Sequence, residues 1–261
     1  MSFIVCNIDL KMLKKYLFLV ALFLVVSFTS AQRKAGGIDP QDYQYKYEYS
    51  FGARIQTNGI SLSTEFGWIK DLYRTRILQL EYTYYIDYRQ KVQKSTQGGR
   101  NYLFGFQNKF HEIHLSYGIK RTIADKANRN GVRLSFIFFG GVSLGLLKPY
   151  YLDVYQQVDT AVPTIEHIRY SAETESVFLD KSIIVGASPI RYGLNQMQPV
   201  AGLHSKSGLN FDWGTKDQFV KALEAGIAFD LYYKRLPIMV NNSNRFYQLA
   251  FYVSFHFGKR W

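Results

Sequence analysis

His114, His204 and His256 could serve as a general base or as metal ligands. Glu112, His114 and Ser116 follow one another in steps of two, and on an extended strand that spacing places their side chains on one face. A histidine beside a carboxylate and a serine could act as the general base of a nucleophilic hydrolase. Any polar strand face would also produce this triplet by chance. We therefore predict no catalytic residues and keep a lipid-modifying barrel enzyme as the second alternative.

His204 and His256 also fall on polar faces of extended segments, so a metal site is conceivable. Nothing resembles the HExxH spacing of a helical zinc site. The Gly98-Gly99 and Gly140-Gly141 pairs lack the strand-turn-helix context of a phosphate loop. We predict neither a metal nor a cofactor.

The strand pattern that positions these residues is clearest at residues 248–258, QLAFYVSFHFG, where every second side chain is large and apolar. Such a strand has one apolar and one polar face. Its length is close to the ~9–11 residues with which a tilted strand crosses a bilayer. Apolar residues outside and polar residues inside are typical of a transmembrane β-barrel.

Seven further segments alternate in the same way, and Thr57-Asn58-Gly59 supplies a tight hairpin after the first. We predict an all-β, antiparallel up-and-down barrel of eight strands. The predicted strands are 43–56, 59–69, 74–87, 109–121, 130–143, 201–213, 219–231 and 248–258.

Three of the four predicted outside connections are long and the three periplasmic ones are short, as in barrels with short periplasmic turns and longer outside loops. The longest, about 144–200, is predicted to be an extracellular cap. Its segments 165–172 and 176–186 could form a hairpin outside the membrane or two extra strands of a ten-stranded barrel.

The inward positions of these strands hold nearly balanced acids and bases. Because desolvated charges need partners, we expect a salt-bridge and hydrogen-bond network that closes the lumen. The alternative is an ion path through a narrow channel for small solutes. The predicted network comprises Glu48, Arg54, Glu65, Glu81, Glu112, His114, Lys120, Arg133, Lys206, Glu224 and Asp230.

The N-terminus has the three-part layout of a cleaved secretory signal peptide, predicted to occupy residues 1–31, with Met12 as an alternative start. Its apolar run of about eleven residues is shorter than the ~20 of a membrane-spanning helix. A periplasmic segment 32–42, the barrel 43–258 and a C-terminal tail 259–261 follow. The only cysteine, Cys6, precedes the predicted cleavage point.

Composition fits this picture, since 17% of the residues are aromatic and barrels carry aromatic girdles. The net charge of +12 has no accompanying nucleic-acid-binding motif, so we expect no nucleic acid partner. Attraction to outer-membrane lipid and lipopolysaccharide is the better-motivated explanation. A soluble β-sandwich is the competing fold.

Several phrases together resemble an uncharacterised family of outer-membrane β-barrel proteins from Bacteroidota. They are TNG at 57–59, GGVSLGLLKPYYLD at 140–153, FLD at 178–180, GLNFDWG at 208–214, LPIM at 236–239 and GKRW at 258–261. The resemblance implies a Gram-negative outer-membrane location and a barrel fold. It supplies no catalytic residues, and it hints at an accessory role in a larger outer-membrane complex.

Two surface features complete the prediction of a non-enzymatic, structural or accessory protein. Phe255, Phe257 and Trp261 resemble the C-terminal signal by which the barrel assembly machinery recognises its substrates. The cap is rich in Tyr and Arg, which are enriched at protein interfaces. The predicted partner contacts are Tyr150, Tyr151, Tyr155, Arg169, Tyr170 and Arg191, together with Phe178.

Overall fold

The computed structural model describes residues 45–87, 89–95, 98–126, 131–156, 164–171, 173–214, 216–240 and 244–261. The chain divides into two compact units, Met1–Asp42 and Tyr43–Trp261. The predicted signal peptide and the segment 32–42 lie outside the described residues, all of which belong to the second unit.

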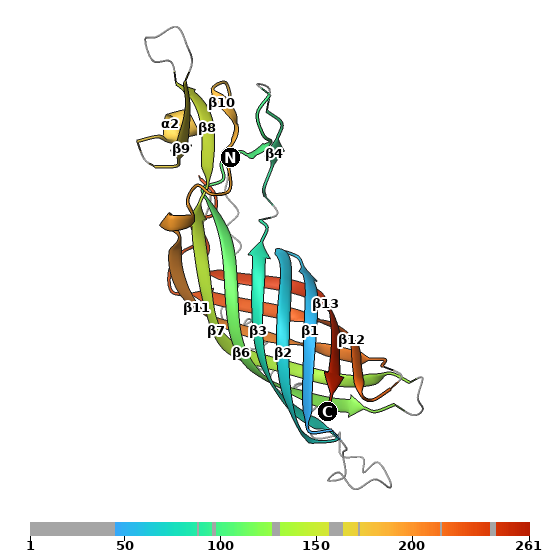
Figure 1. Ribbon diagram of the computed structural model, residues 1–261. Coiled ribbons are helices and arrows are strands. Elements are labelled where there is room, and N and C mark those ends of the chain that lie inside the picture. Colours follow the sequence, from blue (N-terminus) through green and yellow to red (C-terminus); the bar gives the residue numbers. More distant parts are fainter. Residues whose placement is uncertain are drawn as a thin grey trace, which may run out of the picture. The chain divides into compact units, whose positions relative to one another are not determined.

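Eight antiparallel strands close into a barrel (Figure 1). Each strand pairs with its neighbours along the chain, and the last pairs with the first. The predicted eight-stranded barrel is therefore confirmed. The strands are β1 (Tyr47–Gln56), β2 (Gly59–Asp71), β3 (Arg74–Tyr85), β6 (Asn108–Ala124), β7 (Arg133–Pro149), β11 (Gln198–Asp212), β12 (Phe219–Tyr232) and β13 (Tyr247–Arg260).

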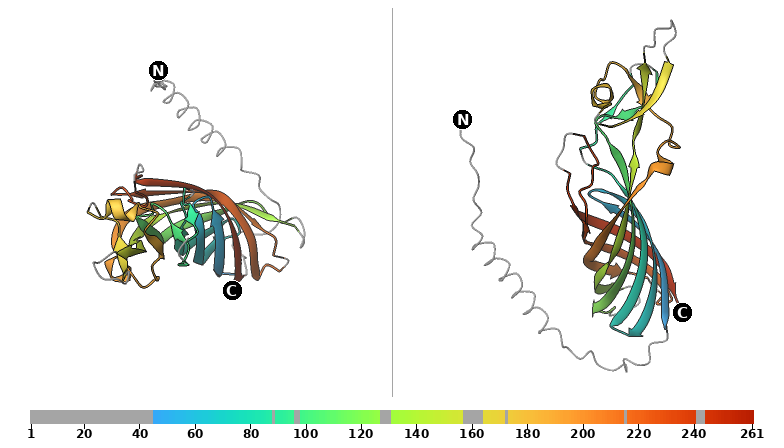
Figure 2. Two further views of the ribbon diagram at one scale, coloured as in Figure 1. Left: turned by 90° about the horizontal axis from the view of Figure 1, so that it is seen from above. Right: turned by 90° about the vertical axis from the view of Figure 1, so that its left-hand side faces the viewer.

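Burial alternates along these strands with the period of two that the sequence shows. In β13, exposed Phe251, Val253 and Phe255 alternate with buried Tyr252 and Ser254. Successive side chains of a strand point to opposite faces, so each strand sends one set inward and the other outward. Figure 2 shows the strands coiling round this common interior.

The hairpin between β1 and β2 needs a glycine. Gly59 has a φ of +155°, and a Cβ there would lie 2.3 Å from the carbonyl oxygen of Tyr84 on β3. A larger residue would clash with the backbone at this point, which explains the glycine of the TNG sequence.

Pairing of β1 with β13 runs from Glu48 opposite Arg260 to Gln56 opposite Tyr252. The predicted C-terminal tail 259–261 is therefore wrong for Lys259 and Arg260, which belong to the strand. Trp261 also donates its backbone N–H to Tyr47. The alternation continues beyond Gly258, because Arg260 turns inward to meet carboxylates.

The connections sort into two ends, and we call the end that holds Trp261 the near end. Near-end connections cover 72–73, 125–132 and 213–218, whereas the far end holds 57–58, 86–107, 150–197 and 233–246. This is the parity that the sequence predicts. The predicted insertion 144–200 is too long, because β7 continues to Pro149. The consecutive Leu146 and Leu147 make both faces of the strand apolar, so the alternation that marks the rest of the strand is lost there.

The far-end connections carry a small domain, which we call the cap and define as the described residues of 86–107 and 150–197. A three-stranded sheet in the order β10-β8-β9 and a β4-β5 hairpin form it, outside the barrel sheet (Figure 1). The alternative prediction of a ten-stranded barrel is thus wrong. The cap elements are β4 (Val92–Gln93), β5 (Tyr102–Leu103), β8 (Tyr151–Gln156), β9 (Thr164–Arg169), α2 (Glu175–Phe178), β10 (Ile184–Ala187) and the 3₁₀ turn η1 (Leu194–Gln196).

No helix in the described part of the chain has the length and hydropathy needed to cross a membrane.

One apolar core joins the cap to the far end of the barrel. Inward Phe110, Leu147 and Tyr232 of the barrel belong to the same cluster as Leu152 and Phe178 of the cap. Leu236 and Ile238 of the LPIM sequence also belong to this cluster. Tyr150 and Phe178 are wrong as partner contacts. Both are buried in this core, because an insertion of this length builds an interior of its own.

We expect Phe178→Ala to loosen the cap while leaving the barrel closed. Phe178 is fully buried, and truncating such a phenylalanine costs about 3–5 kcal/mol. Limited proteolysis should cut the variant within 150–197, while the heat-dependent gel shift of the barrel persists. Val177→Ala is the matched control, because Val177 is exposed. Loss of the gel shift in Phe178→Ala would show that the cap and barrel unfold together.

Candidate functional site in the barrel interior

The barrel interior is a column of buried charges. We divide it into a near cluster, a middle cluster and a far cluster, counted from the end that holds Trp261. Most of their residues occupy strand positions whose side chains point inward, and the near cluster adds residues of the β6–β7 connection. Buried charges cost free energy unless they are paired and hydrogen-bonded, so the pairing of each cluster decides its stability.

The near cluster joins the first and last strands. Glu48 on β1 accepts hydrogen bonds from Lys120 and from Arg260 Nε, the latter at 2.7 Å. Arg260 Nη2 reaches Asp212 Oδ2 at 2.7 Å. Arg133 pairs with Asp125 of the β6–β7 connection, with Nε 2.7 Å from Oδ1. A hollow of about 20 Å³ lies among these side chains, enough for one water molecule.

The middle cluster centres on Glu224. Its Oε1 accepts from Lys206 Nζ at 3.1 Å and from Tyr252 Oη at 2.9 Å. His256 bridges two acids, with Nε2 3.6 Å from Glu224 Oε2 and Nδ1 3.6 Å from Glu65 Oε2.

A phenylalanine and a glycine shape the same level of the interior. Lys206 Nζ lies 4.3 Å from the ring centroid of Phe139, which is fully buried. A Cβ on Gly118 would lie 2.3 Å from this ring. Phe139 thus acts as a cation–π partner, and Gly118 leaves room for it.

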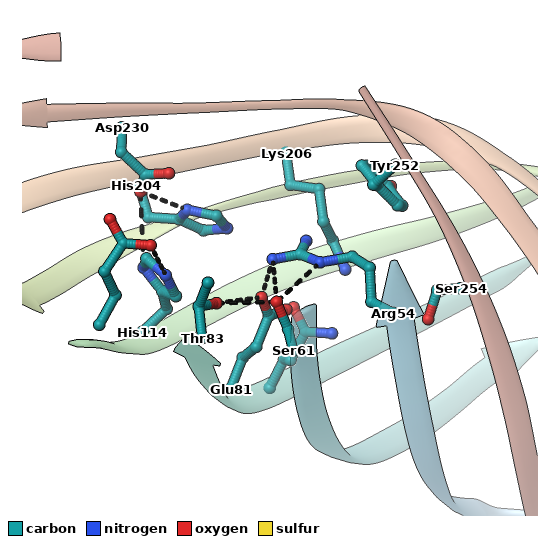
Figure 3. A network of polar contacts seen from close by, with 12 residues as sticks. Arg54, Ser61, Glu81, Thr83, His114, His204, Lys206, Asp230, Tyr252 and Ser254 are labelled. Carbon is teal, nitrogen blue, oxygen red and sulfur yellow. Dashed lines mark hydrogen bonds and ion pairs between the residues drawn. The ribbon is translucent and has the colours of Figure 1, made fainter. Parts of the chain in front are cut away.

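Arg54 joins β1 to its neighbours at this level (Figure 3). It forms an ion pair with Glu81 and lies 3.4 Å from Ser61 Oγ. Thr83 donates to Glu81 at 3.2 Å, and the guanidinium lies 5.0 Å from the Tyr252 ring centroid. One cation thereby connects strands β1, β2, β3 and β13.

The far cluster holds two histidines and two acids without a lysine or arginine in direct contact among the described side chains. Asp230 Oδ1 lies 2.7 Å from His204 Nδ1 and 3.1 Å from Ser143 Oγ. His114 Nε2 is 3.6 Å from Glu112 Oε2, and its ring centroid is 4.3 Å from that of His204. Figure 3 shows both rings directed toward Asp230.

This geometry does not make Ser116 a nucleophile. His114 Nδ1 faces Ser143 Oγ at 3.1 Å, whereas Ser116 Oγ is buried without a hydrogen-bond partner among the described residues. A nucleophile needs a base within hydrogen-bond reach. The Glu112-His114-Ser116 triplet is thus a set of neighbours on one strand face.

Two groups of side chains in the interior have the composition of metal ligands. The donor atoms of His114, His204 and Asp230 lie within 4.8 Å of one another, as do those of Glu65, Glu224 and His256. His204 Nε2 and His256 Nδ1 are buried without hydrogen-bond partners in the described part of the chain. Both groups have the donor set that suits zinc, but His204 and Glu224 already use donor atoms in hydrogen bonds within the network.

A serine, a histidine and an aspartate meet on the cap, which the sequence analysis missed. His167 Nδ1 lies 2.6 Å from Asp153 Oδ1 and 3.3 Å from Ser188 Oγ, and Ser188 also contacts Asp153. In a catalytic triad the two ring nitrogens serve the acid and the serine separately. Here one nitrogen faces both, so the contact ties β8, β9 and the segment after β10 together. No sequence spacing signals it, because the residues come from three separate segments.

A loop carboxylate at the far end is tied down locally. Asp87 is buried and accepts from Arg89 Nε at 2.8 Å and Nη2 at 2.6 Å. Burial alone would raise the pKa of Asp87, but the hydrogen bonds and the charge of Arg89 hold that pKa below its ordinary value. The stabilisation is present at neutral pH and is lost as the pH falls through the depressed pKa.

All eleven residues of the predicted network point into the interior, and ten of them are classed as buried while Lys120 is partly exposed. Four residues outside the predicted network complete the near cluster: Arg260, Asp212, Asp125 and Lys126. The continued alternation after His256 could have indicated Arg260. Asp125 and Lys126 lie in a connection and carry no such signal.

The outward face of the barrel is apolar, in contrast to the charged interior. Large apolar side chains are exposed on all eight strands, among them Phe51, Leu62 and Leu249. Phe255 and Phe257 belong to this surface. At the near end Trp261 lies beside Tyr47 and Phe66, with ring centroids 6.1 and 6.3 Å away. An apolar band edged by aromatic rings resembles the exterior of outer-membrane barrels.

Comparisons with known proteins find similar solved structures, among them outer-membrane β-barrels. No protein-family profile and no curated protein sequence matches the chain. Neisserial surface protein A aligns with 82% of this chain and 96% of its own, at 8% identity and a TM-score of 0.41. The N-terminal β-barrel domain of Pseudomonas aeruginosa OprF covers the same shares at 8% identity and a TM-score of 0.35.

A third similar structure is Ail, the attachment invasion locus protein of Yersinia pestis, in complex with the heparin analogue sucrose octasulfate. It aligns with 82% of this chain and 95% of its own, at 9% identity and a TM-score of 0.36. At these values the likeness is loose. The fold of this chain rests on its own strand order and closure.

We expect Arg260→Ala to destabilise the barrel strongly. The variant leaves Glu48 and Asp212 short of a buried partner, and breaking such a pair from one side costs about 3–5 kcal/mol. Urea unfolding of the refolded barrel in detergent measures the change. Lys259→Ala is the control, since Lys259 is exposed on the same strand. Equal unfolding midpoints for the two variants would contradict a stabilising near cluster.

Proposed function

We propose that this protein is an integral outer-membrane β-barrel protein of a Gram-negative bacterium, with a structural interior and a cap that serves as its interaction surface. The observation that carries the proposal is the inverted polarity of the barrel. Charged side chains fill the inside, while Phe51 and Ile55 are 61% and 69% exposed on the outside. Water does not favour so extensive an apolar surface, whereas lipid does.

The sequence features at both ends support export and insertion. Residues 1–31 have the layout of a signal peptide. Phe255, Phe257 and Trp261 are exposed at the end of β13, where the barrel assembly machinery would recognise them. The near end then faces the periplasm and the cap faces outward, since outside loops of such barrels are the longer ones.

The proposed role is non-enzymatic, as a structural or accessory subunit of a larger outer-membrane complex. Its support is the extended cap, because loops on a rigid scaffold carry most recognition. Arg169 and Arg191 are exposed on the cap, and Tyr151, Tyr155 and Tyr170 are partly exposed. The resemblance to the Bacteroidota family agrees with this role.

We expect an arginine in the centre of the outward face to impair folding into lipid. Val253 lies in the middle of β13 and is 44% exposed. Arginine at the bilayer midplane of a barrel costs about 2–4 kcal/mol, falling to about 0–1 near the interface. Val253→Arg should therefore fold poorly into phospholipid vesicles, as measured by the heat-dependent gel shift.

The control for this experiment is Tyr233→Arg, in the far-end connection and 63% exposed. It should fold as the unmodified protein does. If both arginine variants fold equally well, and the protein stays soluble without detergent, the membrane proposal fails.

A narrow solute channel is the competing function, and one hollow favours it. About 540 Å³ of open space lies at the far end, lined by Asn58, Arg89, Arg245 and Gln248 among others. The ion pairs of the interior argue for a closed path below it. We therefore expect planar bilayers containing the protein to show no steady single-channel conductance, and a steady conductance would favour the channel.

A further inference from the structure

Two adjoining hollows lie at the far end, one on the outward face of the barrel and the other lined mainly by residues of the cap. One measures about 450 Å³ and has walls of Tyr82, Tyr84, Leu146, Ile190, Leu194 and Met197. The other measures about 360 Å³ and includes Arg100. Lys109, Lys148 and Ile190 line both hollows.

Lys109 on β6 and Lys148 on β7 are directly opposite each other in the strand pairing. Like charges in that position destabilise a sheet. Lys148 Nζ donates to the backbone oxygen of Ile190, and Lys109 Nζ lies 5.5 Å from the Tyr150 ring centroid. Neither lysine has an ion-pair partner among the described residues, and no carboxylate lines either hollow there.

This lack of an anion sets the pair apart from the lysines of the interior. Lys120 and Lys206 each contact a glutamate. Lys148 is only 6% exposed, so its charge is largely removed from water without a counter-charge. A buried cation in this state favours a bound anion.

Apart from His111 and the two lysines, apolar and aromatic side chains line the first hollow, and they continue into the outward face. Below the hollows, Leu80 of β3, Leu115 of β6 and Leu144 of β7 are 49%, 49% and 42% exposed. An occupant that fits both the lysine pair and the apolar surface has a negative charge at the level of Lys109 and Lys148. Its apolar chains lie along these strands. Tyr82 and Tyr84 flank the boundary between the two, as aromatic residues do at membrane interfaces.

We propose that Lys109 and Lys148 bind the phosphate of a phosphorylated, multiply acylated lipid of the outer leaflet, the chemistry of lipid A, whose acyl chains lie against β3, β6 and β7. The inference rests on the proposed membrane location and goes beyond it by naming the site and the lipid class. Arg100 at the edge of the second hollow adds a third cation for the headgroup.

Lipid binding by the full chain in detergent tests the site. The probes are bisphosphorylated lipid A, the same lipid with its phosphates removed, and inorganic phosphate, each measured by native mass spectrometry of the protein–lipid complex. We expect the bisphosphorylated lipid to bind. The dephosphorylated lipid should bind with an affinity at least about tenfold lower, because charge-assisted hydrogen bonds are lost.

The Lys109→Gln, Lys148→Gln double variant should reduce binding of bisphosphorylated lipid A by a similar factor. The Lys109→Arg, Lys148→Arg variant should retain binding, since it keeps both charges. Lys234→Gln is the matched control, because Lys234 is exposed at the far end and lines neither hollow. Each variant is first checked for the heat-dependent gel shift of a folded barrel.

Unchanged binding in the folded Gln double variant would overturn the site, as would equal binding of the dephosphorylated lipid. Competition by inorganic phosphate at the concentration of the lipid would show a site for the free anion and would overturn the lipid as its occupant. The membrane proposal fails separately, by failure of the unmodified protein to insert into vesicles. If the protein inserts into vesicles but binds phosphorylated and dephosphorylated lipid A equally, this inference fails and the membrane proposal stands.

Discussion

Closure of the sheet is the constraint on which the rest of this structure depends. The pairing of β1 with β13 removes both sheet edges, so every strand has two neighbours and the backbone groups of the strands are satisfied within the barrel. Closure also forces half of the side chains into a narrow interior. An interior of eight strands is only wide enough for side chains, so those that enter it must fit and neutralise one another.

In that interior, the pairing of charges and the packing of side chains depend on the same arrangement of strands. The near cluster lies across the closing strands, because Arg260 of β13 meets Glu48 of β1 and Asp212 of β11. The ladder and the ion pairs therefore depend on the same register. A slip of one residue would turn the inward charges to the outside. Phe139 and Gly118 show that an aromatic ring can add to an ion pair, since Lys206 contacts both the ring and Glu224.

Much of the barrel could be predicted from alternation, because one oily and one polar face leave a period of two in the sequence. The signal failed where both faces are apolar, at Leu146 and Leu147, and where a strand was assumed to end at Gly258. The burial of Tyr150 and Phe178 has no local signal, because it depends on how the long connection folds into a core of its own. The facing of Lys109 and Lys148, and the meeting of Asp153 with Ser188, depend on register and on cap folding, which no local pattern records.

The two ends of the interior differ in what closes them. At the far end the aromatic and aliphatic core beneath the cap covers the column of charges, whereas the near end has charged side chains around a hollow with room for water. Water has room at both ends, because a hollow of about 540 Å³ also lies at the far end. The side chains of Glu48 and Arg260 are each 4% exposed, against 10% for Asp230, so water screens the near cluster no more than the far cluster. The two ends therefore differ in their seal but not in the screening of their charges, and the strength of each pair follows from its distance and its hydrogen bonds.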